Sequence, residues 1–353
     1  MNILVFLPNW VGDAVMATPT LRALKRGFPT ARIVGLMRPI IADVLAELPY
    51  LDGLFTWNPR SEKKLERTWP VMRALRRERF DLAVLLTNSL HTAAVAWLAG
   101  AKRRVGYRRD ARGWLLTDRL EPLRAGRRFR PSPVIDYYLE LAYYLGCARE
   151  SRQMELATTP ADERAADAVW RACGFSGAER VVILNPGAAF GAAKCWPTGH
   201  FGELAHRLAA IPNTRVLVLC GPNEMKLARE VLKRAGRPGV HSLAEFPVSI
   251  GLSKACVRRA DLMITTDSGP RHFAGAFDVP VITLFGPTHI EWSETYLVKA
   301  SHLQKQVACG PCQLRECPLD HRCMRELSPD QVFNAALAMF RRFPRQRPVP
   351  SAA

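Results

Sequence analysis

Apolar residues recur along this chain with two alternating periods. Short β-branched runs such as Ile3 to Leu7 are typical of buried strands, and the longer stretches between them have the spacing of amphipathic helices. In the first half this pattern predicts strands at 3–7, 32–36, 54–56 and 82–86, and helices at about 12–26, 38–48, 61–78, 89–99 and 134–145. Such alternation predicts a parallel sheet covered by helices on both faces.

The same alternation begins again near residue 180. It predicts strands at 181–184, 216–219, 262–265 and 281–285, and helices at about 198–210, 222–235, 249–258 and 329–342. Between the halves the chain is polar, with Thr158-Thr159-Pro160 as a helix start and Gly174 as a helix stop. A chain of 353 residues is long for a single core. We therefore expect an α/β protein with two doubly wound, Rossmann-like domains that face each other across a central cleft.

These signals set the expected domain boundaries. We expect a first domain at 1–155, a linker at 156–178, a second domain at 179–327, a C-terminal helix at 328–342 and a disordered tail, rich in Pro and Arg, at 343–353.

Composition places the chain among folded globular proteins, because 48% of its residues are hydrophobic and 23% are charged. The first apolar run is short and lacks a basic region before it, unlike a signal peptide. The most apolar long window, 82–101, is interrupted by Asn88, Ser89 and His91, which disfavours a transmembrane helix. We therefore expect a cytoplasmic protein.

The net charge is +18, from 50 basic and 32 acidic residues. Residues 1–150 hold 25 basic and 14 acidic side chains, so 25 − 14 = +11 of this charge lies in the first half. Nucleic acid, an anionic membrane surface or a phosphorylated substrate are the partners that such a charge favours. A basic surface that only confers solubility is the alternative.

The segment 264–287 combines a strand, a turn, a short helix and a second strand. The first strand ends at Asp267, Ser268-Gly269-Pro270 supplies the turn, and Arg271 and His272 open the helix. Backbone N–H groups, the positive helix end and these two candidate cations would point to one place beyond the strand. Such a place favours a phosphate or diphosphate.

Asp13 follows the first strand, where ligands of open α/β sheets collect. Its carboxylate could serve as a general base towards an attacking hydroxyl. A capping or helix-dipole role explains the same position equally well.

The loop from Asn185 to Pro197 is the counterpart in the second half. Its Gly and Ala residues allow a ligand to approach the backbone, and Lys194 adds a positive charge, without the spacing of a P-loop. A small-residue connector with a solvated lysine is the alternative. Glu224 follows the next strand and could accept hydrogen bonds from ribose hydroxyls, or could simply be a first-turn helix acid.

Four of the nine cysteines lie close together, at Cys309, Cys312, Cys317 and Cys323. The spacing C-x2-C-x4-C-x5-C could hold a structural Zn²⁺, with His321 as a spare ligand. A compact reduced loop is the competing interpretation.

Taken together, these segments resemble glycosyltransferase family 9, the lipopolysaccharide heptosyltransferases, and within it most closely the heptosyltransferase II members. The resemblance runs from Met1 to about residue 335. It depends on the order and spacing of Pro-Asn-Trp-Val-Gly-Asp-Ala-Val-Met at 8–16, Thr-Asn-Ser-Leu-His-Thr-Ala at 87–93, Asn-Pro-Gly-Ala and Ala-Lys-Cys-Trp-Pro within 185–197, Thr-Thr-Asp-Ser-Gly-Pro-Arg-His at 265–272 and Leu-Phe-Gly-Pro-Thr at 284–288.

The resemblance implies a GT-B fold and an inverting transfer of L-glycero-D-manno-heptose from ADP-heptose to the inner core of lipopolysaccharide. It implies Asp13 as the catalytic base and places the acceptor near Asn88 and Ser89. At the donor it implies Lys194 beside the diphosphate, Glu224 near the ribose, and Asp267, Ser268, Gly269 and His272 in the donor-binding turn and helix start.

The implied reaction needs no cofactor, so Lys194 and backbone donors would carry the charge of the leaving diphosphate. The implied partners are ADP-heptose, a lipid-anchored lipopolysaccharide core acceptor and the anionic inner-membrane surface, with no nucleic acid. The expected location is the cytoplasm, with peripheral association to the cytoplasmic face of the inner membrane.

Two other functions compete with this interpretation. A family member that uses another nucleotide sugar or acceptor would have the same motifs. A zinc-containing nucleic-acid-binding protein would explain the charge and the cysteines, but not the paired ligand loops after corresponding strands. A Rossmann oxidoreductase is disfavoured because no G-x-G-x-x-G follows the first strand.

Overall fold

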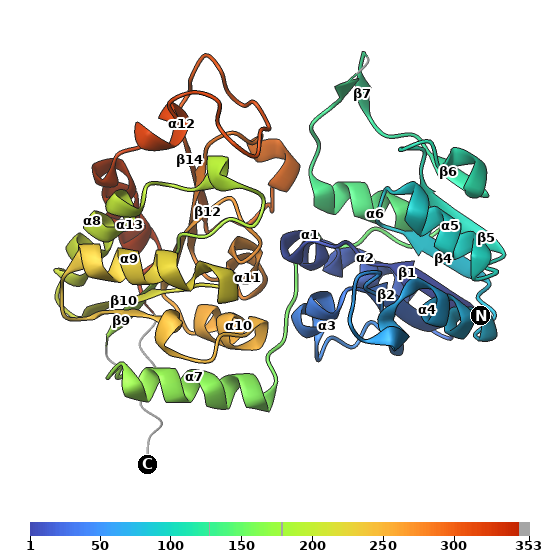
Figure 1. Ribbon diagram of the computed structural model, residues 1–353, viewed down its shortest axis with the longest axis horizontal. Helices are drawn as coiled ribbons and strands as arrows, with labels where there is room; N and C mark the ends of the chain where they lie inside the picture. The colour runs from blue at the N-terminus through green and yellow to red at the C-terminus, as the bar shows by residue number, and fades with distance from the viewer. Residues whose placement is uncertain (127, 178, 346–353) are drawn as a thin grey trace. The chain divides into compact units, whose positions relative to one another are not determined.

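Each half of the chain folds around its own six-stranded parallel sheet (Figure 1). The computed structural model describes residues 1–126, 128–177 and 179–345. Within these residues, unit 1 comprises Met1–Ala157 with Glu291–Tyr296, and unit 2 comprises Thr158–Ile290 with the chain from Leu297 onwards.

The sheet of unit 1 has the strand order β3-β2-β1-β4-β5-β6. Its strands are β1 (Asn2–Phe6), β2 (Arg32–Met37), β3 (Gly53–Thr56), β4 (Leu82–Leu85), β5 (Arg103–Tyr107) and β6 (Asp118–Leu120). Its helices are α1 (Val11–Met16), α2 (Thr18–Gly27), α3 (Pro39–Leu45), α4 (Thr68–Arg77), α5 (Leu90–Leu98) and α6 (Val134–Tyr144), with single 3-10 turns η1 (Lys64–Glu66) and η2 (Gly113–Leu115). A two-stranded hairpin, β7 (Arg124–Ala125) and β8 (Arg128–Phe129), precedes α6.

The sheet of unit 2 repeats this order as β11-β10-β9-β12-β13-β14. Its strands are β9 (Arg180–Asn185), β10 (Thr214–Val218), β11 (Val240–Ser242), β12 (Leu262–Thr266), β13 (Val281–Phe285) and β14 (Ala300–Gln304). Its helices are α7 (Pro160–Ala172), α8 (Thr198–Ala209), α9 (Met225–Ala235), α10 (Ile250–Arg258), α11 (Arg271–Ala276), α12 (Arg322–Arg325) and α13 (Pro329–Arg342), with 3-10 turns at Ala192–Lys194, Pro222–Glu224 and Leu243–Glu245. A further 3-10 turn, Ile290–Ser293, lies almost wholly in the unit 1 segment Glu291–Tyr296. The two parallel sheets confirm the prediction of two doubly wound α/β domains.

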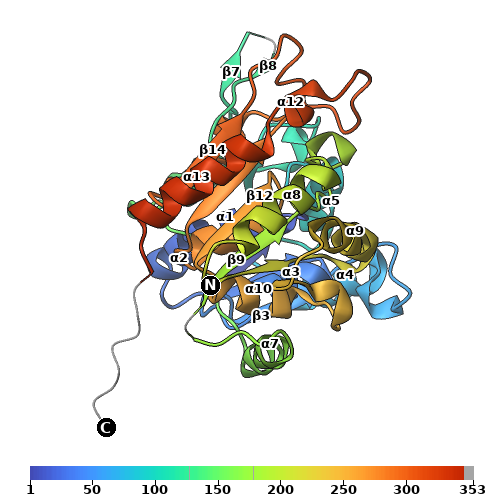
Figure 2. The ribbon, with the colours of Figure 1, turned by 90° about the vertical axis from the view of Figure 1, so that its left-hand side faces the viewer.

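Alternating apolar side chains build the core on each face of these sheets. On one face of unit 1, Phe6 and Leu85 pack with Leu75 of α4 and Ala96 of α5, so these two helices cover that face (Figure 1). In unit 2, α13 lies against the sheet beside α8 (Figure 2). None of the helices in the described part of the chain is long and apolar enough to cross a membrane.

The helix expected at 12–26 is two helices, because the chain bends between Met16 and Thr18. Pro19 has no N–H to donate to the carbonyl of Val15, and the Thr18 hydroxyl donates to that oxygen instead, at 2.8 Å. The break sets the short α1, which carries Asp13, apart from the longer α2.

The segment expected as a linker, 156–178, contains α7, which belongs to unit 2 and contacts α10. Thr159 caps α7 in a capping box with Asp162, in agreement with the helix start read from the sequence. Of the expected tail, Arg345 forms an ion pair with Asp261 at 3.2 Å, and residues 346–353 lie outside the described residues.

Candidate functional site

In both units the residues singled out by sequence follow the two central strands of the sheet. The connections from β1 and from β4 lead to opposite sides of the sheet in unit 1, and those from β9 and β12 do the same in unit 2. This arrangement is the topological switch point, where open α/β sheets bind their ligands. Asp13 follows β1, Asn88 and Ser89 follow β4, Lys194 follows β9, and Asp267 follows β12.

Asp13 lies in the first turn of α1 and is half-buried. Helix α6 packs against α1 and brings the buried Tyr138 towards it. Burial, and secondly the negative charge of Asp13, raise the pKa of Tyr138 well above its usual value, so its hydroxyl stays protonated. The Asp13 carboxyl group thus lies beside a neutral phenol at the carboxyl edge of the sheet.

Asn88 and Ser89 both have structural hydrogen bonds. The Asn88 carbonyl oxygen accepts from Arg112 at 3.1 Å and from the Tyr137 hydroxyl at 3.0 Å, and the Ser89 hydroxyl caps α5 by accepting from the N–H of Thr92. These bonds shape the loop after β4. The role of Asn88 and Ser89 towards an acceptor stays a prediction.

The buried guanidinium of Arg112 organises this loop and was not predicted from the sequence. It donates to the carbonyl oxygens of Thr87 and Tyr107 and to the Asn88 side chain. Burial lowers its pKa to about 10, and it therefore remains charged at neutral pH. No local sequence pattern predicts this role for an arginine, since the oxygen atoms that it contacts are brought together only by the fold.

In unit 2, the centre of the candidate site is a buried cluster of charges around Asp267. The Lys194 ammonium donates to the Asp267 carboxylate at 2.5 Å and to its backbone carbonyl at 3.1 Å. Arg271 donates to the other carboxylate oxygen at 3.2 Å, and the Thr288 hydroxyl donates to the oxygen that Lys194 contacts, at 2.7 Å. The cations Lys194 and Arg271 thus both bind the Asp267 carboxylate.

Burial opposes ionisation of Asp267, but Lys194 and Arg271 outweigh it and hold the pKa of Asp267 well below its usual range. Next to it, His272 is buried, and burial followed by the charge of Arg271 lowers the pKa of His272 well below 6.5. His272 is therefore neutral at physiological pH, which corrects its expected part as a cation. Its Nδ1 has no hydrogen-bond partner among the described residues.

A network of neutral hydrogen bonds joins the loops after β9 and β12. The Asn185 amide donates to Thr265 at 3.0 Å and to the Ser268 hydroxyl at 2.8 Å. The Thr266 hydroxyl donates to the carbonyl of Gly187 at 2.8 Å. Gly269 contributes its carbonyl, which accepts from the N–H of His272. The two loops that sequence placed at a diphosphate therefore form one connected structure.

Glu224 lies against the small-residue loop. Its carboxylate accepts from the N–H of Gly221 at 2.9 Å, and a Cβ at position 187 would lie 2.0 Å from its Oε1. Gly187 is therefore needed for the carboxylate to occupy this place. Burial, and secondly the charge of Glu224, raise the pKa values of Cys195 and Cys220, which lie around it.

The Cys-rich segment, residues 309–323, packs against the Lys194 loop. The carbonyl of Arg315 accepts from the N–H of Ala193 at 3.0 Å, and a ring nitrogen of His321 lies 2.8 Å from the carbonyl oxygen of Ala193. Gln313 also donates its N–H to the carbonyl of Pro287, at 2.8 Å. The segment thus holds the loop after β9 and the loop after β13.

The side chains of this segment do not form the tetrahedral site that their spacing allows. Among the described residues, no group of three or more His, Cys, Asp or Glu side chains is arranged to hold a metal ion. Cys309 and Cys312 are exposed, whereas Cys323 is buried. Structural zinc stays a prediction, which metal analysis of the purified protein would test.

Comparisons with known proteins found relatives of this chain both by sequence and by fold. A family model described as glycosyltransferase family 9 (heptosyltransferase) matches residues 68–322. Lipopolysaccharide heptosyltransferase 2 of Escherichia coli strain K12 is 29% identical over 314 residues, which cover 85% of this chain and 87% of that protein.

Solved structures share the fold over nearly the whole chain. The E. coli ADP-heptose lps heptosyltransferase II superposes with a TM-score of 0.77 at 23% identity, covering 97% of this chain and 99% of that one. The E. coli heptosyltransferase WaaC with ADP gives a TM-score of 0.71 at 16% identity, covering 96% of this chain and 100% of that one.

Proposed function

Because the chain belongs to glycosyltransferase family 9, we propose that it transfers L-glycero-D-manno-heptose from ADP-heptose to the inner core of lipopolysaccharide. One observation carries the proposal. In each unit, residues suited to this transfer, Asp13 in unit 1 and Lys194 with Asp267 in unit 2, follow the central strands at the switch point of a doubly wound sheet. The relatives described above support it, since they are named as lipopolysaccharide heptosyltransferases.

Unit 2 holds the donor in this proposal. The positive charges of Lys194 and Arg271 favour the diphosphate, because charge-assisted contacts to phosphate are strong in a buried site. Lys194 would share its protons between Asp267 and the diphosphate, and Glu224 would accept hydrogen bonds from the ribose. Ser268, Gly269 and the neutral His272 would shape the turn beside the sugar. WaaC, which has the same fold, was solved with ADP.

Unit 1 supplies the general base. The acceptor hydroxyl would lose its proton to Asp13 as its oxygen bonds to the anomeric carbon of the heptose. The bond from that carbon to the diphosphate breaks at the same time, and ADP leaves with the electron pair of that bond. The configuration at the anomeric carbon is thereby inverted. Because Tyr138 stays protonated, it is not a second base that would compete with Asp13 for the proton.

We further propose that the enzyme acts at the anionic cytoplasmic face of the inner membrane, where a lipid-anchored acceptor would be found. The net charge of +18 supports this, because basic side chains are attracted to anionic leaflets. Catalysis needs no metal in this proposal.

Mass spectrometry of the products tests the function. ADP-heptose and a defined inner-core acceptor should give an acceptor heavier by one heptose, together with ADP. Turnover of other sugar nucleotides at equal or greater kcat/KM would favour the second candidate, a family member with a different donor.

A further inference from the structure

One face of unit 1 exposes large apolar side chains on adjacent elements. Leu65 of η1 is 82% exposed, Trp69 of α4 is 77% exposed, and Trp114 of η2 is 71% exposed. Trp97 of α5 is also exposed. Helix α4 contacts both η1 and α5, and α5 contacts η2, so the four elements are neighbours in unit 1. We call these four side chains, with the exposed Leu90 and Leu98 of α5, the apolar face.

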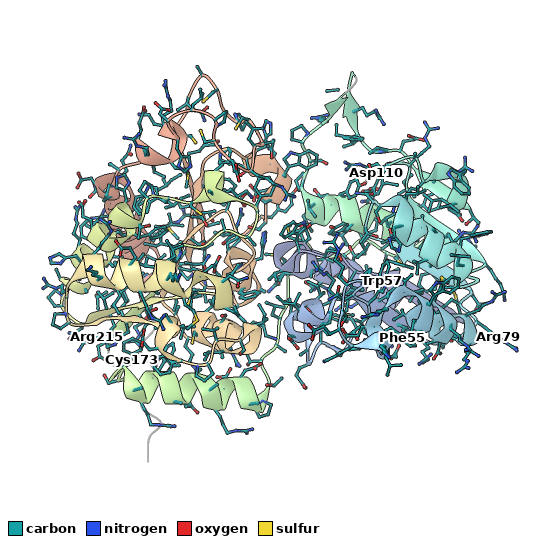
Figure 3. The ribbon with its side chains drawn as sticks, in the orientation of Figure 1. Phe55, Trp57, Arg79, Asp110, Cys173 and Arg215 are labelled. Atoms are coloured by element: carbon teal, nitrogen blue, oxygen red, sulfur yellow. The ribbon has the colours of Figure 1, made fainter. Side chains whose placement is uncertain are left out.

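The core of unit 1 does not need these side chains. Phe55 and Trp57 (Figure 3) pack against the core cluster, and Trp57 also donates its indole N–H to Thr68. In α4, Val71, Met72 and Leu75 are the buried residues. Trp69 is not among these buried residues.

The exposed residues of α4 and of α5 each follow helical spacing, so each helix has one stripe of exposed side chains. On α4 the exposed positions Trp69, Arg73 and Arg76 follow one another at i, i+4 and i+7, so an aromatic residue and two cations share a stripe. On α5 the stripe is apolar, with Leu90, Ala94, Trp97 and Leu98. An apolar stripe thus lies beside a cationic one.

Positive charge surrounds the apolar face. Segment 57–79 contains eight basic and three acidic residues, 8 − 3 = +5, and segment 89–104 contains three basic residues and none that is acidic. Arg79, just after α4, points away from the unit (Figure 3). An open hollow beside Trp69 is lined by Lys64, Arg67 and Thr68, whose donors suit a phosphate group.

We propose that the apolar face is the surface by which this protein docks on an anionic phospholipid bilayer. Trp side chains are favoured at the membrane–water boundary, and Arg and Lys beside them contact the phosphates of anionic headgroups. A protein partner would explain the tryptophans, but the one-sided charge fits a surface that is anionic throughout. This inference deepens the proposed function by naming the surface that docks on the membrane. It rests on the proposed function only for the identity of the lipid-anchored acceptor.

Co-sedimentation of the full-length protein with vesicles tests the surface without donor or acceptor. We expect binding to vesicles that contain phosphatidylglycerol, weaker binding at high salt, and little binding to pure phosphatidylcholine. The double variant Trp69→Ser, Trp97→Ser should lower the affinity by about ten-fold or more, because both interfacial anchors are lost.

Matched variants separate this surface from general effects. Leu65→Ser should weaken binding, and Leu54→Ser, which removes an exposed leucine from the edge strand β3 of the same unit, should not. Arg73→Gln with Arg76→Gln should weaken binding more than Lys226→Gln with Lys233→Gln on α9, although both pairs remove two charges. All variants should retain the circular dichroism and the ADP affinity of the unchanged protein, which shows that they fold.

Several results would overturn the inference. They are equal binding to neutral and anionic vesicles, equal effects of Leu65→Ser and Leu54→Ser, or undiminished vesicle binding by the double tryptophan variant. Dissociation of a dimer by that variant, with vesicle binding unchanged, would assign the face to a second copy. If ADP-heptose is not the donor but these vesicle results hold, the proposed function fails and the docking surface stands.

Discussion

At the scale of single residues, Asp13 and Asp267 are two carboxylates with opposite environments. Asp13 is half-buried at the start of a short helix, beside a phenol that stays protonated. Asp267 is buried and bonded to Lys194, Arg271 and Thr288. The first is suited to accept a proton, whereas the second is held ionised and organises positive charge.

Asp13→Asn should lower kcat about 10²–10⁴-fold, since the amide cannot accept the acceptor proton. ADP affinity, measured by calorimetry, should stay unchanged, because Lys194 and Asp267 belong to the other unit. Glu62→Gln removes an exposed carboxylate from unit 1 and serves as the control. A matching loss of ADP affinity would assign Asp13 to donor binding instead.

The pKa of Asp267 predicts how acid affects stability. Its folded-state pKa lies below the unfolded value of about 3.9, so its contribution to stability is complete above that pH and declines as pH falls further. Between the two pKa values the free energy of unfolding should fall by about 1.4 kcal/mol per pH unit.

Unfolding of the unchanged protein, followed by circular dichroism below pH 4, should therefore depend more steeply on pH than that of Asp267→Asn. The variant should also be less stable at pH 7, by about 3–5 kcal/mol, because Lys194 and Arg271 lose their buried partner. Asp330→Asn removes an exposed ion pair with Arg207 and should change neither property. Equal pH slopes for Asp267→Asn and the unchanged protein would contradict the assignment.

Some of these residues could be predicted from the sequence, and others could not. Asp13, Lys194 and Asp267 each follow a β-branched run, and that position alone indicates the carboxyl edge of a sheet. The neutrality of His272 could not be predicted, because it depends on burial and on the neighbouring Arg271. The pairing of Lys194 with Asp267 joins residues 73 positions apart, which no local pattern contains.

At the scale of elements, the loop after β9 is built around a carboxylate. Gly187→Ala should displace Glu224, since the new Cβ would lie 2.0 Å from its Oε1. We expect weaker ADP binding with little change in the stability of the unit, because Glu224 is only partly buried.

Gly177→Ala is the matched control, because a Cβ there meets no atom within 4 Å. The double variant Gly187→Ala, Glu224→Ala should bind ADP no more weakly than Glu224→Ala alone, because both changes act on one carboxylate. Additive losses of ADP affinity would contradict this explanation.

The elements missed by sequence lie mainly at the sheet edges. Strands β6, β11 and β14 are terminal strands of their sheets, and β14 has no buried residue. An edge strand needs fewer apolar side chains, so the periodic signal is weak there. Strand β5 was also missed, because its buried part is only Val105, Gly106 and Tyr107. Central strands such as β1 and β12, buried on both faces, were predicted nearly to their ends.

At the scale of the whole molecule, one strand order is used twice, for two different tasks. The order 3-2-1-4-5-6 creates a ligand edge in each unit without fixing its chemistry. In unit 1 that edge presents the carboxylate of Asp13, and in unit 2 it presents Lys194 and Arg271 around the buried carboxylate of Asp267.

Positive charge fixed in unit 2 predicts the response to chelators. Lys194 and Arg271 can neutralise a leaving diphosphate, so heptose transfer should proceed at an unchanged rate in EDTA. The measurement is the initial rate of ADP release, before and after dialysis against the chelator. A rate that falls to background and returns on addition of Mg²⁺ would overturn the metal-free proposal.

The Cys-rich segment connects through its backbone to two loops of unit 2, at Ala193 and at Pro287. In the proposed function, we therefore expect a change in the length of this segment, or in its thiols, to alter ADP affinity through these two loops. Shortening it by a residue, or oxidising its exposed Cys309 and Cys312, would pull on the backbone next to Lys194. A design that transfers the Lys194 loop to another scaffold would therefore also need the loop after β13 and the Cys-rich segment that holds both loops.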